Sequence, residues 1–178
     1  MSEIAATESR QQLIPKDQAL FDPTGIDLSG RLMDKAAIEQ WIPHRGDMSL
    51  LDGVIWLSED KSRIIGIKHN RADEFWVPGH FPQVALFPGV LMVEAAAQLM
   101  STQYNMKVGN NRTGIFTRIE SCAFRQSVSV GDDLYILVQE MKFGGRRFQG
   151  AVQGWVNGKV AFDAQLSGII KMDKMAGG

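Results

Sequence analysis

Two segments in the first half of the chain have the pattern of short strands. Residues 62–69 follow the two-residue period of a half-buried strand, and residues 50–58 are rich in strand-forming side chains. The turn-forming residues 59–61 between these two runs predict a hairpin. Upstream, Asp34 can cap a short helix over residues 35–41.

A different pattern begins after a Pro- and Gly-rich loop at residues 78–89. Residues 90–104 consist largely of strong helix formers and are apolar on nearly every face. A helix that is apolar all round is usually buried, and one of this length is too short to span a bilayer. The pattern therefore predicts one long helix that other elements enclose.

Four long strand-like segments follow the helix and are separated by turn sequences such as Gly144-Gly145 and Asn157-Gly158, which favour hairpins. They cover residues 114–124, 133–143, 146–156 and 159–171. An antiparallel sheet curled around the single helix is the simplest arrangement that buries that helix. The sequence thus predicts an α+β fold in which a curved antiparallel sheet wraps one long central helix.

Composition and charge narrow the class of protein. With 178 residues, 44% of them hydrophobic, and a formal charge of −1, the chain has the size and balance of one globular domain. The charge does not suit a general nucleic-acid binder and no apolar run is long enough for a membrane span, so we expect neither partner. The single cysteine, Cys122, suits the reducing cytoplasm, and we expect it to be a small buried hydrophobe.

Residues 1–32 differ in composition from the rest of the chain. They are rich in polar and turn-forming residues and lack the apolar core of a secretory leader. We expect an N-terminal arm that is either flexible or packed on a partner subunit through Leu20 and Phe21. The folded domain is expected to cover residues 33–178.

Two of the three histidines, His44 and His80, lie beside prolines in loops, where restricted backbone freedom helps to place an imidazole. The third, His69, ends a predicted strand and is expected at the surface. An isolated loop histidine is more often held by a turn carbonyl than used in catalysis. The histidines and Cys122 lack the spacing of metal ligands, so we expect neither a metal nor a cofactor.

Glu94 is the feature that favours catalysis at His80. It is the lone carboxylate of the predicted buried helix, where burial would raise its pKa and make it a proton donor near neutral pH. The alternative is a structural glutamate that is hydrogen-bonded to the backbone. Gln98 lies one turn further along the same face and can orient the carboxyl group or touch a substrate.

The start of the same helix offers a third component. Pro88 and Gly89 precede it, so its first N–H groups lack helical acceptors and can stabilise negative charge. A base, an acid and an oxyanion site of this kind together fit proton abstraction next to a carbonyl group.

These residues resemble the 3-hydroxyacyl-[acyl-carrier-protein] dehydratases of type II fatty-acid synthesis, in the branch that dehydrates without isomerising. The 14-residue step from His80 to Glu94 matches that family's catalytic spacing. The resemblance runs from about residue 33 to residue 171 and rests on the segments Pro43-His44-Arg45, Gly79-His80-Phe81-Pro82, Phe87-Pro88-Gly89-Val90-Leu91, Glu94-Ala95-Ala96-Ala97-Gln98 and Phe124–Asp132.

The resemblance implies a hot-dog fold and the reversible dehydration of a 3-hydroxyacyl thioester, carried by acyl carrier protein, to the trans-2-enoyl thioester. Family members form homodimers with active sites at the interface, where His from one chain faces Glu from the other, and dimers often assemble into hexamers as trimers of dimers. Carried over to this chain, the site residues are His80 as the base, Glu94 as the acid, the amides of Gly89 and Val90 at the thioester carbonyl, and Gln98 as a supporting polar group.

The chain departs from the family at Gln83-Val84-Ala85 and at Gly46-Asp47-Met48, in loops that shape the acyl channel. The acyl chain and the choice between carrier protein and coenzyme A therefore stay open. Two other functions also stay open: a hot-dog acyl thioesterase and a non-catalytic subunit that binds acyl thioesters. The channel is expected to lie beside the central helix, with substrate-binding walls from Phe81, Phe87, Met92, Met100 and Met48.

Overall fold

The computed structural model describes residues 13–109 and 112–171. Its order of elements agrees with the predicted one: a short helix, a hairpin, one long helix and four long strands. The elements are β1 (Met33–Asp34), α2 (Lys35–Ile38), the 3-10 helix η1 (Gly46–Met48), β2 (Gly53–Leu57), β3 (Arg63–His69), α3 (Gly89–Val108), β4 (Gly114–Phe124), β5 (Asp133–Phe143), β6 (Arg147–Val156) and β7 (Lys159–Ile170).

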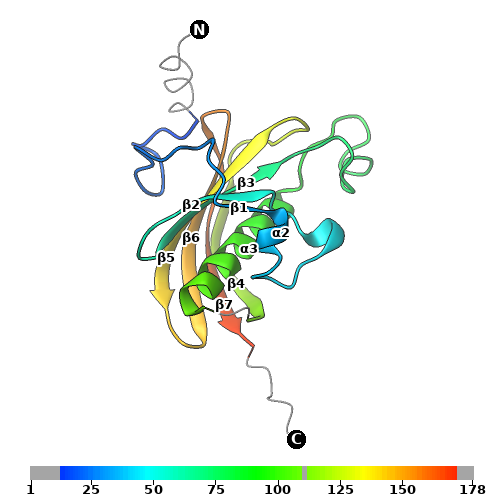
Figure 1. Ribbon diagram of the computed structural model, residues 1–178. Helices are drawn as coiled ribbons and strands as arrows, with labels where there is room; N and C mark the ends of the chain where they lie inside the picture. The colour runs from blue at the N-terminus through cyan, green and yellow to red at the C-terminus, as the bar shows by residue number, and fades with distance from the viewer. Residues whose placement is uncertain (1–12, 110–111, 172–178) are drawn as a thin grey trace, which may run out of the picture.

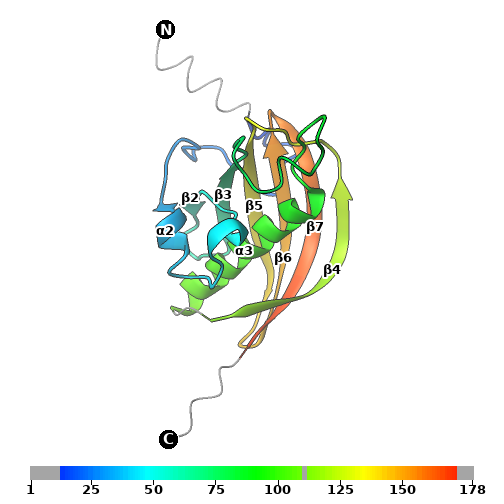
Figure 2. The same ribbon diagram turned by 90° about the vertical axis from the view of Figure 1, so that its right-hand side faces the viewer.

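The strands form one antiparallel sheet in the order β1-β2-β3-β5-β6-β7-β4. Helix α3 lies across the concave face of this sheet (Figure 1). Figure 2 shows the sheet curving around the helix, with β4 at the far edge. The predicted hot-dog arrangement is therefore confirmed.

The alternation along β3 separates two apolar cores. Ile64 faces the helix side, whereas Ile65 and Ile67 belong to a second cluster on the outer face of the sheet. Gly66 lets α3 approach closely, because a Cβ at this position would lie 2.9 Å from the methyl groups of Leu99. The position of α3, and of the side chains it carries, thus depends on a small residue in β3.

The N-terminal arm covers the outer face of the sheet of its own chain. Ile14 and Phe21 are buried there, against a cluster that includes Trp155. The backbone N–H of Leu20 donates to Oε1 of Gln153 at 2.7 Å. Residues 13–32 therefore pack on the sheet of their own chain, and a contact with a partner subunit stays a prediction. Residues 1–12 lie outside the described residues.

Two helices differ in length from the prediction. Asp34 caps α2 as expected, accepting a hydrogen bond from Ala37 at 2.8 Å, but the helix ends at Ile38 and tightens into turns ahead of Pro43. Helix α3 continues past residue 104 to Val108 and ends at Gly109, which adopts a positive φ of 76°. In the described residues no helix has the length and apolar character needed to cross a membrane.

The expectation that Cys122 is buried is wrong for this chain. The thiol is exposed because Cys122 lies on β4, the edge strand, whose residues are almost all exposed on both faces. Several large apolar side chains of β4 are therefore also exposed: Ile115, Phe116, Ile119 and Phe124.

Candidate active site

His80 lies in the loop between β3 and α3, and backbone hydrogen bonds fix its position. Its N–H donates to the carbonyl of Trp76 at 2.9 Å, and its own carbonyl accepts from Leu86 at 2.9 Å. The His80–Phe81 peptide bond is cis, and the Phe81 ring stacks on the imidazole with centroids 4.1 Å apart. The loop thus holds the imidazole in one place on a short, closed segment.

The hydrogen bond of the His80 ring defines its chemistry. Nδ1 lies 2.8 Å from the carbonyl oxygen of Leu86. A carbonyl can only accept, so Nδ1 carries the proton and Nε2 of the neutral imidazole keeps a free lone pair. His80 therefore has the tautomer that a general base requires.

Glu94 and Gln98 lie one turn apart on α3, as their spacing predicted. The Gln98 side chain is 1% exposed, and its Nε2 donates to Oε1 of Glu94 at 2.9 Å and to the carbonyl of Met48 at 2.8 Å. Its Oε1 accepts from the N–H of Leu50 at 3.1 Å. Gln98 therefore orients the carboxyl group and ties it to the loop before β2.

His44 is the site residue that the sequence analysis did not assign to the reaction. Its Nε2 lies 3.3 Å from Oε1 of Glu94, and its Nδ1 is buried without a hydrogen-bond partner in the described part of the chain. His44 and Gln98 both approach Oε1, whereas no described residue donates a hydrogen bond to Oε2. One carboxylate oxygen is thus held and the other is available to a substrate.

The surroundings of Glu94 lower its pKa, so the expected rise is wrong for this chain. His44 beside the carboxyl group lowers the pKa, burial acts in the opposite direction, and the hydrogen bond from Gln98 lowers it further. The sequence argument included burial but not the two partners. Glu94 is therefore a carboxylate at neutral pH.

The first turn of α3 presents free backbone donors five residues before Glu94 on the same helix. Pro88 precedes the helix, and the amides of Gly89 and Val90 donate to no acceptor within the described residues. A Cβ at Gly89 would lie 2.9 Å from the ring of Phe124, so a larger residue here would have to displace this ring. Such a helix start has the free donors that an oxyanion site needs, and that role stays a prediction.

An apolar pocket extends from Glu94 along α3. Of the five expected channel residues, Met100 lines this pocket, Phe87 and Met92 are buried in the core, and Phe81 and Met48 are exposed. The lining residues are His44, Glu94, Ala97, Gln98, Met100, Ser101, Gly114, Phe116 and Phe148. Glu94 thus lines a pocket whose other walls come from α3, β4, β6 and His44.

His80 and Glu94 do not meet in the single chain. No hydrogen bond or ion pair joins them in residues 13–109 and 112–171, where His80 binds Leu86 and Glu94 binds Gln98 and His44. No group of three or more potential metal ligands is present in the same residues. Within the described residues the two side chains thus have different hydrogen-bond partners.

The chain is similar in sequence to a family of known proteins. The family model of the FabA-like domain matches residues 42–165. The 3-hydroxyacyl-[acyl-carrier-protein] dehydratase FabZ of Anoxybacillus flavithermus is 36% identical over 136 residues, which are 76% of this chain and 95% of the relative. The FabZ of Exiguobacterium sibiricum is 37% identical over 135 residues, 75% of this chain and 96% of the relative.

Solved structures show the same fold at lower identity. The dehydratase heterocomplex ApeI:P from Xenorhabdus doucetiae superposes with a TM-score of 0.65 at 15% identity, covering 76% of this chain and 91% of that chain. A hypothetical thioesterase with coenzyme A from Streptococcus pneumoniae gives a TM-score of 0.51 at 10% identity, over 66% of this chain and 84% of that chain. Dehydratases and thioesterases thus share this fold.

Proposed function

We infer that this chain, which belongs to the FabA-like family and within it to the 3-hydroxyacyl-[acyl-carrier-protein] dehydratases, is a hydro-lyase of fatty-acid synthesis. It removes water reversibly from a 3-hydroxyacyl thioester on acyl carrier protein and forms the trans-2-enoyl thioester. The observation that carries this inference is the Glu94 carboxylate, which is held on one oxygen and lines a pocket between α3 and the sheet.

The first half of the reaction uses His80 and the start of α3. Nε2 of His80 takes a proton from C2 of the substrate, because Nδ1 is already committed to the Leu86 carbonyl. Negative charge then develops on the thioester oxygen. The free amides of Gly89 and Val90 stabilise this charge.

The second half breaks the C3–O bond, while the electron pair left at C2 forms the double bond. The leaving hydroxyl group needs a proton, which can come from a protonated Glu94 or from the His80 imidazolium. The lowered pKa of Glu94 supports the second route. In that route Oε2 of Glu94 accepts a hydrogen bond from the hydroxyl group and orients it, and His80 returns its proton as water departs.

A second copy of the chain completes the site. No hydrogen bond or ion pair joins His80 to Glu94 in the described residues, and the edge strand β4 exposes apolar side chains that a partner would cover. Val90, at the start of α3, is also 73% exposed. We expect a homodimer in which His80 of one chain faces Glu94 of the other, and association of three dimers into a hexamer.

The test follows the enoyl product and the free thiol in parallel, with 3-hydroxyacyl thioesters of acyl carrier protein and of coenzyme A. We expect enoyl absorbance to appear without thiol release, and faster turnover on the carrier protein. Thiol release without enoyl formation would indicate a thioesterase, and binding without either product a non-catalytic subunit. Sedimentation of the same protein measures its assembly. The cytoplasm is the proposed location, since the exposed thiol of Cys122 suits a reducing compartment.

A further inference from the structure

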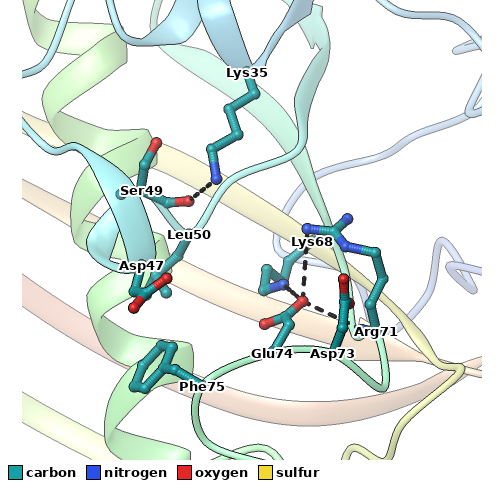
Figure 3. Close-up of a pocket in the computed structure, with 10 residues that line it drawn as sticks. Lys35, Asp47, Ser49, Leu50, Lys68, Arg71, Asp73, Glu74 and Phe75 are labelled. Carbon is teal, nitrogen blue, oxygen red and sulfur yellow. Dashed lines mark hydrogen bonds and ion pairs between the residues drawn. The ribbon is translucent and has the colours of Figure 1, made fainter.

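Lys68 is a buried cation that the proposed reaction does not use. It lies near the end of β3 that leads into the loop containing His80, and it is only 2% exposed. Its Nζ donates to the carbonyl of His69 at 2.7 Å, contacts the carboxylate of Glu74, and lies 3.7 Å from Oδ2 of Asp52. Figure 3 shows Lys68 and Glu74 directed toward each other. A lysine is rarely buried this completely unless its charge is paired, and the neighbouring carboxylates supply that pairing.

Glu74 links Lys68 to the loop that contains His80. Its Oε1 accepts from Lys68 and from the N–H of Arg71 at 3.2 Å, and its Oε2 accepts from the indole Nε1 of Trp76 at 2.9 Å. Burial raises the pKa of Glu74, but the hydrogen bonds from Lys68, Trp76 and Arg71 together outweigh it, so the pKa is lowered. Glu74 is thus an ionised group with both oxygens occupied.

Trp76 connects this ion pair to His80. The carbonyl of Trp76 accepts from the N–H of Gly79 at 3.1 Å and from the N–H of His80 at 2.9 Å. Its ring contacts the ring of Phe87 at the other end of the loop, with centroids 5.4 Å apart. Nζ of Lys68 lies 5.8 Å from the centre of the Phe87 ring. The two ends of the loop that carries His80 are therefore joined by the contact between Trp76 and Phe87, and the Lys68 ammonium group lies beside Phe87.

We propose that Lys68 and Glu74 are positioning residues for His80: together they fix the Trp76 indole, and through it the loop that holds the imidazole. The proposal rests on the proposed role of His80 as the base. A small displacement of a base costs turnover more than it costs substrate binding, because the proton is transferred only in a narrow range of geometries.

The test compares variants of the full-length enzyme at Lys68 and Glu74 with a matched ion pair elsewhere. Lys68→Met and Glu74→Gln each remove one charge, and Lys68→Arg keeps the cation. The double variant Lys68→Met/Glu74→Leu removes both charges, so it avoids an unpaired buried charge if the single variants fold poorly. The control variant is Lys107→Met, which breaks the ion pair with Glu140 at 2.8 Å on the distal end of α3.

Hydrogen exchange and kinetics give separate readouts. In Lys68→Met, Glu74→Gln and the double variant, we expect exchange in residues 77–86 to accelerate at least tenfold, with exchange in β5 and β6 unchanged. We expect kcat to fall roughly 10- to 100-fold with KM nearly constant, and Lys68→Arg to recover most of the loss. Lys107→Met should change neither loop exchange nor kcat.

Wild-type kcat in the folded double variant would overturn the proposal, as would a lower kcat with unchanged exchange in residues 77–86. Loop exchange does not depend on turnover, whereas full turnover in His80→Ala would overturn the proposed function. The two failures can therefore be told apart.

Discussion

Nε2 of His44 lies 3.3 Å from Oε1 of Glu94, although 50 residues separate the two in the sequence. This contact explains why a half-buried carboxyl group on an apolar helix has a lowered pKa. It also leaves Oε2 as the oxygen that faces a substrate. His44 is thus the strongest contributor to the ionised state of Glu94.

The first prediction concerns His44 itself. In His44→Ala, burial of Glu94 is no longer offset by its strongest partner, so the pKa of Glu94 should rise. The acid limb of the kcat profile should then move to higher pH, because the ionised carboxylate is the active form. At neutral pH we expect kcat to fall roughly 10- to 100-fold, the range for loss of a hydrogen bond to a charged group. An acid limb that does not move in this variant would contradict the assignment.

The second prediction tests whether the active site is shared between chains. His80→Ala and Glu94→Gln should each lower kcat by roughly 10²–10⁴, while circular dichroism shows an intact fold. When the two variants exchange subunits, each mixed dimer should regain one complete site, and part of the activity should return. If mass spectrometry shows mixed dimers and activity stays absent, His80 and Glu94 act within one chain.

The bounds of the strands could be predicted from the sequence more closely than the contacts of the candidate site. The last four strands match their predicted bounds within one residue, because Gly-Gly and Asn-Gly turns mark their ends. The pairing of Glu94 with Gln98 was predictable too, since helical spacing places residues four apart on one face.

The contact between His44 and Glu94 had no local signal. It joins a loop to a helix across 50 residues, and only the tertiary fold brings them together. For the same reason the direction of the Glu94 pKa was predicted wrongly: burial follows from an apolar pattern, but the partners that oppose it do not. The position of the N-terminal arm was likewise beyond the sequence, because two apolar residues do not specify which surface they cover.

The third prediction concerns this arm. Phe21 is 6% exposed on the outer sheet face, whereas Leu32, close to the end of the arm, is 54% exposed. Phe21→Ala should lower the free energy of unfolding by about 3 kcal/mol, the lower end of the range for a buried phenylalanine. Leu32→Ala should change it by less than about 0.5 kcal/mol. Both should keep wild-type kcat, since the arm lies on the face opposite α3. Denaturant titration and turnover measurements check this. A Phe21→Ala variant as stable as the wild type would show that the arm contributes little to the free energy of unfolding.

The fourth prediction follows from the lowered pKa of Glu94. The ordinary value is 4.5, and the folded value lies below it. The ionised carboxylate therefore contributes stability that is complete above pH 4.5 and is lost as the pH falls through the folded value. We expect the stability advantage of the wild type over Glu94→Gln to shrink as the pH falls below 4.5. Denaturant unfolding across this pH range measures it, and an advantage that grows on acidification would reverse the sign.

The last prediction concerns the acyl chain. Met100 and Phe148 line the pocket that begins at Glu94, and both also line a second, smaller pocket farther along α3. Met100→Ala should join the two pockets and move the preferred substrate to longer chains. In the wild type, kcat/KM should rise about fourfold per methylene until the first pocket is full, because each buried methylene contributes about 0.8 kcal/mol. Met92→Ala is the control, since Met92 is equally buried but lines neither pocket. A chain-length series decides the matter: a wild-type profile that peaks at four carbons, or an equal shift in both variants, would mean that this pocket does not hold the acyl chain.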